Sequence, residues 1–256
     1  EYVRRLAESE GVEIKTEQDL RNYDKKRKDK KVSNDDWTSP TDPDSRIAKM
    51  KDGRTHLAYK AEHTVDLDSE FILDASVYHA DEGDSETLLE SVASAQENLE
   101  QAEVYRDIEE VVADKGYHKN ETLADCAEWG CFGLRTYIPE RDTGERRWTD
   151  KPTDYERAFR ANRRRVEGTR GKRLQKKRSE LVERSFAHVC ETGGARRTWL
   201  RGLENINKRY KIQTAARNLG LLMRALFGVG KPRCLQGGFS LAYFLQVVTK
   251  VLKFAA

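Results

Sequence analysis

The stretch from Val111 to Tyr117 restricts the fold of this chain more than any other. Val-Val-Ala forms a short apolar run that predicts a buried strand, and Asp114, Lys115 and Gly116 follow it at once. Because glycine permits a sharp turn, the strand would present the Asp114 side chain at the edge of a sheet. Ligands of open α/β sheets bind at such strand ends. A turn-capping aspartate explains the same residues equally well.

The order of the predicted elements indicates an α/β fold with a mixed sheet. Apolar and polar residues alternate over residues 55–65, and a second strand-like run covers residues 71–77, which predicts a β-hairpin. A helix capped by Asp84 or Ser85 follows, then the strand at residues 110–113. A second helix from Asn120 and a strand within residues 131–138 complete the order β-β-α-β-α-β.

The composition allows one large domain or two small ones and shows no global basic excess. The chain has 256 residues, of which 37% are hydrophobic and 36% are charged, and its formal net charge is +3. The core is therefore modest beside a large solvated surface. The cysteines form no Cys-x-x-Cys pair, which argues against zinc and favours reduced thiols in a cytosolic protein; they are Cys126, Cys131, Cys190 and Cys234.

Positive charge is concentrated after Pro139. Between Arg157 and Arg178 the only acidic residue is Glu167, so this block repels itself and needs an anionic partner or solvent. A solvated helical face is one explanation, but the density of arginine favours bidentate contacts with nucleic-acid phosphates. Trp199 suits base stacking or a simple core anchor. The candidate nucleic-acid-binding residues are Arg163, Arg164, Arg165, Arg170, Lys172, Arg173, Lys176, Lys177, Arg196, Arg197 and Trp199.

Two helices are predicted after the basic block. Residues 179–191 form an amphipathic pattern with Glu183 at the edge of its apolar stripe, where it serves either a site or an exposed pair with Arg178 or Arg184. A long helix follows from residue 203 to residue 227, and residues 239–254 form an apolar tail that predicts a packing helix better than a membrane span. The residues expected to face inward on the long helix are Leu203, Ile206, Tyr210, Leu219, Leu222 and Leu226.

Several short motifs, taken in order, resemble the DDE transposases of bacterial insertion sequences, whose catalytic domain has a ribonuclease-H-like fold. The resemblance runs from about Asp36 to Arg233, and each motif is weak alone. The motifs are Asn34–Trp37, Asp42–Arg46, Leu57–Ala61, Gly83–Ser85, Ala113–His118, Val182–His188 and Ala216–Leu222.

The resemblance implies a metal-dependent enzyme that cleaves and transfers DNA strands. Asp114 matches the family's second metal-binding acid, and Glu183 matches the third in its Glu-x-x-Phe setting; His118 and Lys115 would orient Asp114 or contact phosphate, or are plain turn residues. Carboxylates on separate elements suit Mg²⁺ or Mn²⁺, and two such ions activate the attacking oxygen and stabilise the leaving one. No organic cofactor is implied.

Two departures from the family pattern qualify these roles. No apolar strand that ends in Asp precedes the hairpin, so the first acid is missing, and the chain resembles the later part of a longer, N-terminally truncated transposase. We therefore expect it to be inactive alone. Ser179 and Cys190 occupy the positions where some branches of the family carry Arg and Lys around the last Glu. Glu167 is the alternative third acid, although Gly168 and Gly171 weaken a helix there.

The resulting expectation is a ribonuclease-H-like mixed sheet flanked by helices. Its parts are a polar, partly disordered arm (1–50) with a basic run at residues 25–31, the hairpin and β-α-β part (51–139), the basic insertion (140–178), the catalytic-Glu helix with the closing helices (179–228), and the apolar tail (229–256). The expected partners are DNA, as element ends and target, and further copies of the chain on DNA, with no membrane. The expected location is cytoplasmic and nucleoid-associated.

Two other functions remain open at this point. A non-enzymatic basic relic of a transposase would bind nucleic acid through the arginine block alone, with strong salt dependence and no need for Asp114. A metal-dependent nuclease with another target is also compatible, because a ribonuclease-H-like fold supports several activities.

Overall fold

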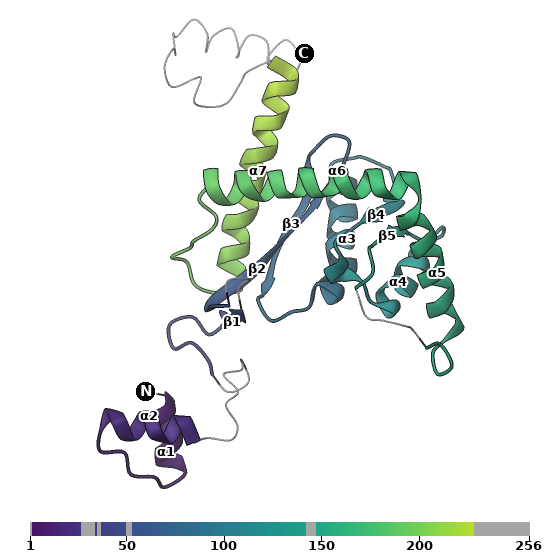
Figure 1. Cartoon of the computed structure of the whole chain (residues 1–256). Coiled ribbons are helices and arrows are strands. Elements are labelled where there is room, and N and C mark those ends of the chain that lie inside the picture. Colours follow the sequence, from purple (N-terminus) through teal and green to yellow (C-terminus); the bar gives the residue numbers. More distant parts are fainter. Residues whose placement is uncertain (1, 27–33, 35–36, 50–52, 142–146, 228–256) are drawn as a thin grey trace, which may run out of the picture. The chain divides into compact units, whose positions relative to one another are not determined.

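A computed structural model describes residues 2–26, 34, 37–49, 53–141 and 147–227 of the chain (Figure 1). Its internal contacts divide it into two compact units. The first unit contains residues 1–60, 79–81 and 201–203, and the second contains residues 61–78, 82–200 and 204–256. The predicted tail at residues 229–256 lies outside the described residues.

The first unit begins with two short helices, α1 (Tyr2–Ser9) and α2 (Glu17–Lys26), where the sequence predicted a partly disordered arm. Strand β1 (Arg46–Lys49) pairs antiparallel with the start of β2 (Thr55–Val65). The loop before β1 carries two aspartates that accept hydrogen bonds from the backbone where a later helix begins. Asp42 Oδ1 accepts from Gly202 N at 3.0 Å, and Asp44 Oδ2 accepts from Leu203 N at 3.0 Å. These contacts give the Asp42–Arg46 motif a helix-capping role.

The predicted hairpin is present, because β2 continues into β3 (Ile72–His79) and the sheet order is β1-β2-β3. Strands β4 (Glu110–Val112) and β5 (Arg135–Tyr137) form a separate parallel pair, with Val111 opposite Thr136. The described strands are therefore split between an antiparallel and a parallel sheet, where the sequence predicted a single mixed sheet. The α/β class and the element order are confirmed.

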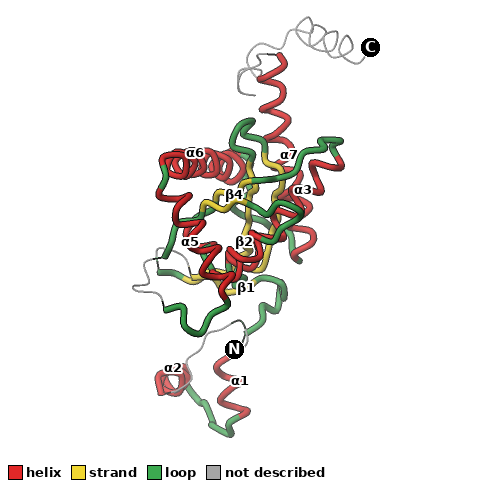
Figure 2. Tube along the Cα trace, turned by 90° about the vertical axis from the view of Figure 1, so that its right-hand side faces the viewer, coloured by secondary structure: helices red, strands yellow, loops and turns green. Residues whose placement is uncertain are grey.

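Figure 1 shows four helices around the parallel pair, and Figure 2 labels α3, α5 and α6 around β4: they are α3 (Asp84–Gln101), α4 (Asn120–Ala127), α5 (Thr153–Glu167) and α6 (Thr169–Phe186). The apolar faces of α3, α4 and α5 meet residues next to the two strands in one core. The buried members of that core are Leu88, Val92, Ala113, Leu123, Ala124, Cys126, Leu134, Ile138, Ala158 and Phe159. The N-cap of α3 is Gly83, one residue before the earlier of the two predicted caps, and the Glu86 side chain accepts from Gly83 N at 3.3 Å.

Two asparagines fix helices to strands. The side-chain amide of each forms hydrogen bonds with both the backbone N–H and the backbone C=O of a single residue at a strand end. Asn162 on α5 is fully buried; its Oδ1 accepts from Ile138 N at 3.0 Å and its Nδ2 donates to Ile138 O at 2.8 Å. Asn218, on α7 (Leu203–Phe227), makes the same pair with Ile72 at 3.0 and 2.8 Å. Because buried backbone groups must be satisfied, each amide fixes a helix to a strand end at a defined register.

Helix α6 runs unbroken across the predicted boundary at residues 178/179, so the second half of the basic block, from Arg170 to Arg178, shares one helix with Glu183. Gly171 allows the tight corner between α5 and α6, since a Cβ there would lie 2.1 Å from Arg165 O. The segment Ala187–Thr192 then continues α6 as a π-helical turn, η2. Such turns within helices are frequent at functional sites.

The prediction for the inward face of α7 was half wrong. Ile206 and Tyr210 are buried as expected, but Leu219, Leu222 and Leu226 are 58%, 41% and 56% exposed. Both faces of this helix are apolar, and periodicity alone does not tell which one meets the core. Among the described residues, no helix is long and apolar enough to cross a membrane.

Candidate active site

Asp114 occupies the position predicted for it, exposed and directly after β4. The buried Ala113 lies between the end of β4 and Asp114, and its N donates a hydrogen bond to Tyr137 O of β5 at 3.4 Å. Asp114 caps a short 3₁₀ turn, η1 (Lys115–Tyr117), and its Oδ1 accepts from Lys115 N at 2.6 Å. The capping interpretation is thus correct as far as Oδ1 goes. The other carboxylate oxygen of Asp114, Oδ2, lies at the carboxyl end that the two parallel strands share, where a cation or substrate can bind.

A buried carboxylate supports the turn that carries Asp114. Glu62 on β2 is only 7% exposed, and it accepts hydrogen bonds from Thr87 Oγ1 at 2.6 Å and Ser91 Oγ at 3.1 Å. Tyr117 of η1 bonds to the same carboxylate; burial raises the pKa of Tyr117, and the negative charges of Glu62 and Asp84 raise it further. The hydroxyl therefore stays protonated and donates to Glu62, which ties the turn after Asp114 to strand β2.

Two further contacts hold the backbone of the same turn. The Arg141 guanidinium donates to Lys115 O at 3.1 Å through Nε and to Gly116 O through a second nitrogen. The Asp84 carboxylate lies so close to Gly116 that an added Cβ would be 2.4 Å from its Oδ2. A side chain at position 116 would therefore have to displace the Asp84 carboxylate, whereas the backbone of the turn does not itself need glycine, because Gly116 has no positive φ.

Lys115 is exposed near Asp114, whereas His118 is not placed for phosphate contact. His118 is 6% exposed and packs edge-on against Phe159, with 5.8 Å between the ring centroids. Its ring belongs to the interior beside α5. Of the two neighbours that the sequence offered as helpers, only Lys115 faces solvent.

Glu183 lies on α6 near the end of the helix and is exposed. Its Oε1 accepts from Ser179 Oγ at 2.8 Å. The alternative ion pair with Arg184 is not formed, because Arg184 contacts Glu70 at 3.0 Å and also Glu180. Among the described residues, no cation neutralises Glu183, so its carboxylate is available to an external one. Glu167, the alternative third acid, is the last residue of α5 and is also exposed.

Helix α6 is fixed to the strand ends next to Asp114. The Gln175 side chain donates to Ala113 O at 3.1 Å and also to Tyr137 O, so it bridges the ends of β4 and β5. Glu183 lies two turns further along the same helix, about 12 Å along its axis. No hydrogen bond joins Asp114 to Glu183, and the described residues contain no group of three or more His, Cys, Asp or Glu able to share a metal ion.

An oriented chain of hydrogen bonds lies beneath Glu183. Ser185 is fully buried and donates to Val182 O at 2.7 Å, so its oxygen accepts from Nδ1 of His63 at 2.7 Å. Nε2 of His63 then carries no proton and accepts from the Tyr210 hydroxyl at 2.9 Å. This geometry assigns the neutral, Nδ1-protonated form to His63.

Stacking and burial reinforce that assignment. The His63 ring stacks on Phe186 with 4.0 Å between centroids and an interplanar angle of 4°. Burial, together with the positive charge of Arg217, lowers the pKa of His63 to about 3. Burial, with Cys190 beside the hydroxyl, raises the pKa of Tyr210. The network therefore joins β2, α7 and the helix segment around Glu183 without any charged member.

The predicted nucleic-acid residues fall into two groups. Five are bound by the protein itself: Arg163 by Glu140 (2.6 Å), Arg165 by Thr136 O (2.9 Å), Arg170 by Glu110 (2.6 Å), Lys177 by Asp68 (2.8 Å) and Arg196 by Glu191. The others are exposed, and within the described part of the chain they have no ion-pair partner: Arg164, Lys172, Arg173, Lys176 and Arg197. Lys172, Arg173 and Lys176 share one face of α6, because residues three and four apart are neighbours on a helix.

Trp199 is not a core anchor, since 80% of it is exposed. Arg209 covers one face of its ring at 4.3 Å from the centroid. A cation over one aromatic face leaves the other face open for stacking. The stacking interpretation of Trp199 therefore fits the structure better than the packing one.

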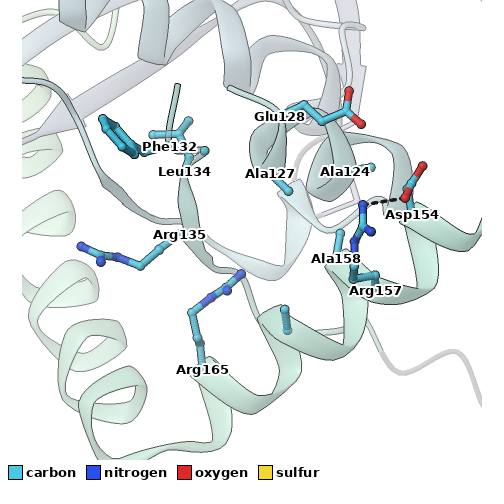
Figure 3. A pocket seen from close by; sticks show the side chains of 12 residues that line it. Ala124, Ala127, Glu128, Phe132, Leu134, Arg135, Asp154, Arg157, Ala158 and Arg165 are labelled. Carbon is cyan, nitrogen blue, oxygen red and sulfur yellow. Dashed lines mark hydrogen bonds and ion pairs between the residues drawn. The ribbon is translucent and has the colours of Figure 1, made fainter. Parts of the chain in front are cut away.

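A cavity of about 250 Å³ lies among α4, α5 and the start of β5, away from both candidate acids (Figure 3). Small residues line much of it, and two of its arginines already have acidic partners: Arg157 pairs with Asp154, which also lines the cavity, at 2.6 Å, and Arg135 pairs with Glu109 at 2.6 Å. Neither Asp114 nor Glu183 lines this cavity. We do not assign it a part in the site.

Comparison with known families decides the class of protein. Residues 14–219 match the family of the transposase DDE domain, which is well over half of the chain and includes both candidate acids. The chain belongs to the DDE transposase family. Proteins with this domain act in DNA transposition, bind DNA and generally use divalent metal ions. No curated protein and no solved structure matches the chain at a significant level.

Sequence reasoning about this DDE transposase missed the two residues of β2 that support the segments of the candidate acids, the buried Glu62 and the partly buried His63. Glu62 and His63 are neighbours on β2, so their side chains point to opposite faces, one toward η1 and the other toward Ser185 and Tyr210. Their one signal in the sequence is that polar residues occupy both faces of a strand. Only the tertiary partners, which come from distant segments, distinguish such residues from solvated ones.

Proposed function

We propose that this chain is a catalytic-domain part of a DDE transposase of an insertion sequence, in which Asp114 and Glu183 bind Mg²⁺ or Mn²⁺ for phosphodiester cleavage and strand transfer. The observation that carries the proposal is the bridge made by Gln175. It fixes the helix that bears Glu183 to the strand end that presents Asp114. Both carboxylates are exposed, and each retains an oxygen that accepts no hydrogen bond from the residues the structure describes.

Asp114 and Glu183 are of the chemical type that binds a hard divalent cation, but two residues are fewer than such a site needs. Carboxylate oxygens are the ligands that Mg²⁺ prefers, and the ions would activate the attacking oxygen and stabilise the leaving one. Two carboxylates supply few of the ligands that a two-ion site needs. We therefore propose that the chain alone does not cleave DNA and requires a further acid that Asp114 and Glu183 do not supply. Cleavage of a labelled duplex by the purified chain with Mg²⁺ would disprove this inactivity.

Metal binding is the direct test of the two acids. We would titrate the chain, labelled with ¹³C at Asp and Glu carboxyl groups, with Mn²⁺ and follow paramagnetic broadening of each signal. We expect the Asp114 and Glu183 signals to broaden first and Asp114→Asn to weaken binding. Glu183→Gln and Glu167→Gln form a matched pair: if only the second weakens binding, Glu167 is the third acid. Uniform broadening across exposed acids would reject a defined site.

The exposed basic face of α6 would contact DNA phosphates. Because each neutralised phosphate releases counterions, log K should fall with log salt by about 0.9 for each contact. We expect Lys172→Ala, Arg173→Ala and Lys176→Ala each to reduce that slope by about one contact. Arg170→Ala is the matched control on the same helix, since its guanidinium is already paired with Glu110, and it should change the slope less.

A second function is favoured by the same group of exposed cations. If the chain is a non-enzymatic nucleic-acid-binding relic, DNA binding depends on that face of α6 and is indifferent to Asp114→Asn and to metal. The DNA titration, repeated with and without Mn²⁺ on the wild type and on Asp114→Asn, separates the two proposals. Binding of element-end DNA that strengthens with Mn²⁺ only when Asp114 is present supports the enzyme.

A further inference from the structure

The turn between β2 and β3 contains a residue in a conformation that its side chain disfavours. Glu70 has a φ of 64°, in the left-handed region that glycine adopts without strain and a residue with a long side chain does not. Its N–H donates to Asp66 O at 3.0 Å, and Asp66 N donates to Phe71 O at 2.8 Å, so the strained residue belongs to the turn that closes the hairpin. Such strain persists only where the surroundings fix the residue, and it is a reason to look for a function.

Two arginines from different helices hold Glu70. The Arg184 guanidinium on α6 donates through Nη1 to both carboxylate oxygens of Glu70, at 3.0 Å each. The Arg217 guanidinium on α7 donates to Glu70 O at 2.8 Å. Glycine would suit the backbone of this turn better, but it has no carboxylate to offer Arg184. The ion pair, rather than the turn, therefore accounts for a glutamate at this position.

Glu103 shows the ordinary use of the same conformation. It is the other non-glycine residue with a positive φ in the part of the chain that the structure describes, and its φ is 58°. Glu103 follows the last turn of α3, where Val104 N donates to Leu99 O at 2.9 Å, a common way for a helix to end. Its side chain is exposed, whereas that of Glu70 is engaged by a second element.

Glu70 reaches a candidate acid through Arg184, which directly follows Glu183 on α6. The next residue, Ser185, is fully buried and bonded to His63 on the same hairpin at 2.7 Å. Two successive residues after Glu183 are thus held to the hairpin, one by an ion pair and the other by a neutral hydrogen bond. The direction in which Glu183 leaves the helix depends on both contacts.

The same ion pair sets the charge around Glu183. Arg184 also donates to Glu180, so two carboxylates compensate one guanidinium. Without the Glu70 carboxylate, this end of α6 would be one charge more positive, and a positive charge opposes the binding of a cation nearby. A compensated Arg184 therefore favours a divalent cation at the neighbouring Glu183.

We propose that Glu70 is a positioning residue for Glu183: its carboxylate holds Arg184 to the hairpin turn, which fixes the end of α6 and compensates the positive charge beside the acid. The inference rests on the proposed metal-binding role of Glu183. Residues that support a metal ligand change the affinity for the ion by about 10- to 100-fold when they are replaced. Because Glu70 acts through a second side chain, we expect the lower end of that range, about tenfold.

Two substitutions of Glu70 separate positioning from stability. Glu70→Gly removes the carboxylate and relieves the strain at φ, whereas Glu70→Gln removes the charge and keeps the strain, so Glu70→Gln should have the lower thermal unfolding midpoint. Both should nevertheless weaken Mn²⁺ binding at Glu183 by about tenfold, measured by paramagnetic broadening of its ¹³C-carboxyl signal. Asp68→Asn is the matched control, because Asp68 lies in the same turn and pairs with Lys177 of the same helix at 2.8 Å, but is 94% exposed; it should leave Mn²⁺ binding unchanged.

The outcomes distinguish this inference from the proposed function. If Mn²⁺ does not broaden the Glu183 signal in the wild type, the metal-binding role of Glu183 fails and the positioning role fails with it. If the wild type and Glu70→Gly bind Mn²⁺ equally well, the positioning role alone is overturned. Binding that follows the unfolding midpoints, weaker in Glu70→Gln than in Glu70→Gly, would also overturn it, because Glu70 would then support only the fold. Equal weakening in both variants supports it.

Discussion

The two candidate acids and the residues beneath them differ in almost every physical respect. Asp114 and Glu183 are exposed, and their contacts with the protein are one backbone N–H and one hydroxyl. Glu62 and His63 are enclosed, and each is joined to two or more distant segments. The exposed acids are open to an external ligand such as a metal ion, whereas Glu62 and His63 fix the positions of the segments that carry those acids.

The difference separates the two candidate acids from the residues that hold their segments in place. The turn after Asp114 is held by a carboxylate, Glu62, which takes hydrogen bonds from Thr87, Ser91 and Tyr117. The segment around Glu183 is held by a neutral imidazole. A buried charged support and a buried neutral one respond differently to pH and to substitution, and this makes the comparison testable.

The largest expected effect is the loss of stability on acidification through His63. The folded-state pKa of His63, about 3, lies below the ordinary histidine value of 6.5, so the unfolded chain binds the extra proton between these values. The contribution of neutral His63 is fully present above pH 6.5 and is lost as the pH falls toward 3. The slope is at most about 1.4 kcal/mol per pH unit, or roughly 2 kcal/mol between pH 6.5 and 4.5.

Urea unfolding of the wild type and of His63→Asn across that pH range measures this effect. The asparagine amide keeps a donor for Ser185 but does not titrate. We expect the difference in unfolding free energy between the two proteins to shrink as the pH falls, since carboxylates contribute equally to both. A difference that stays constant from pH 7 to pH 4 would show that His63 is solvated and protonates normally.

Substitution of the charged support should have the next largest effect. Glu62→Gln replaces an oxygen that accepts from Thr87 or Ser91 with an amide nitrogen that cannot accept. We expect the free energy of unfolding to fall by about 1–3 kcal/mol, the usual cost of an unsatisfied buried group. Glu90→Gln on α3 is the control, because that residue is exposed and should change stability by less than about 0.5 kcal/mol. Equal effects of both would mean that Glu62 does not carry the network.

The sequence predicted the exposed half of this comparison and missed the enclosed half. The hairpin, the strand before Asp114 and the helix that bears Glu183 were evident because periodicity and turn residues are local signals. Asp114 and Glu183 followed from the family resemblance, and their metal-binding roles stay predictions. Glu62 and His63 escaped because a polar residue on a strand gives no local sign of being buried; their partners lie on α3, η1, α6 and α7.

The same limit explains the error on α7. Ile206 and Tyr210 were correctly placed inward, but the three distal leucines repeat at a helical spacing that both faces satisfy. Arg217 and Asn218 decide which face packs, because they bond the backbone of Glu70 and Ile72. Buried polar contacts of this kind set the rotation of a helix where apolar residues alone leave it ambiguous.

The smallest expected effect belongs to the candidate ligands themselves. Asp114→Asn and Glu183→Gln keep the size of each exposed side chain and remove its charge, so each should change the free energy of unfolding by less than about 0.5 kcal/mol. Removing uncompensated negative charge can even stabilise an exposed site. Both variants should nevertheless lose Mn²⁺ binding, whereas Glu62→Gln should lose stability first. A large loss of stability in Glu183→Gln would instead give that carboxylate a structural role and would remove the main reason to place a metal there.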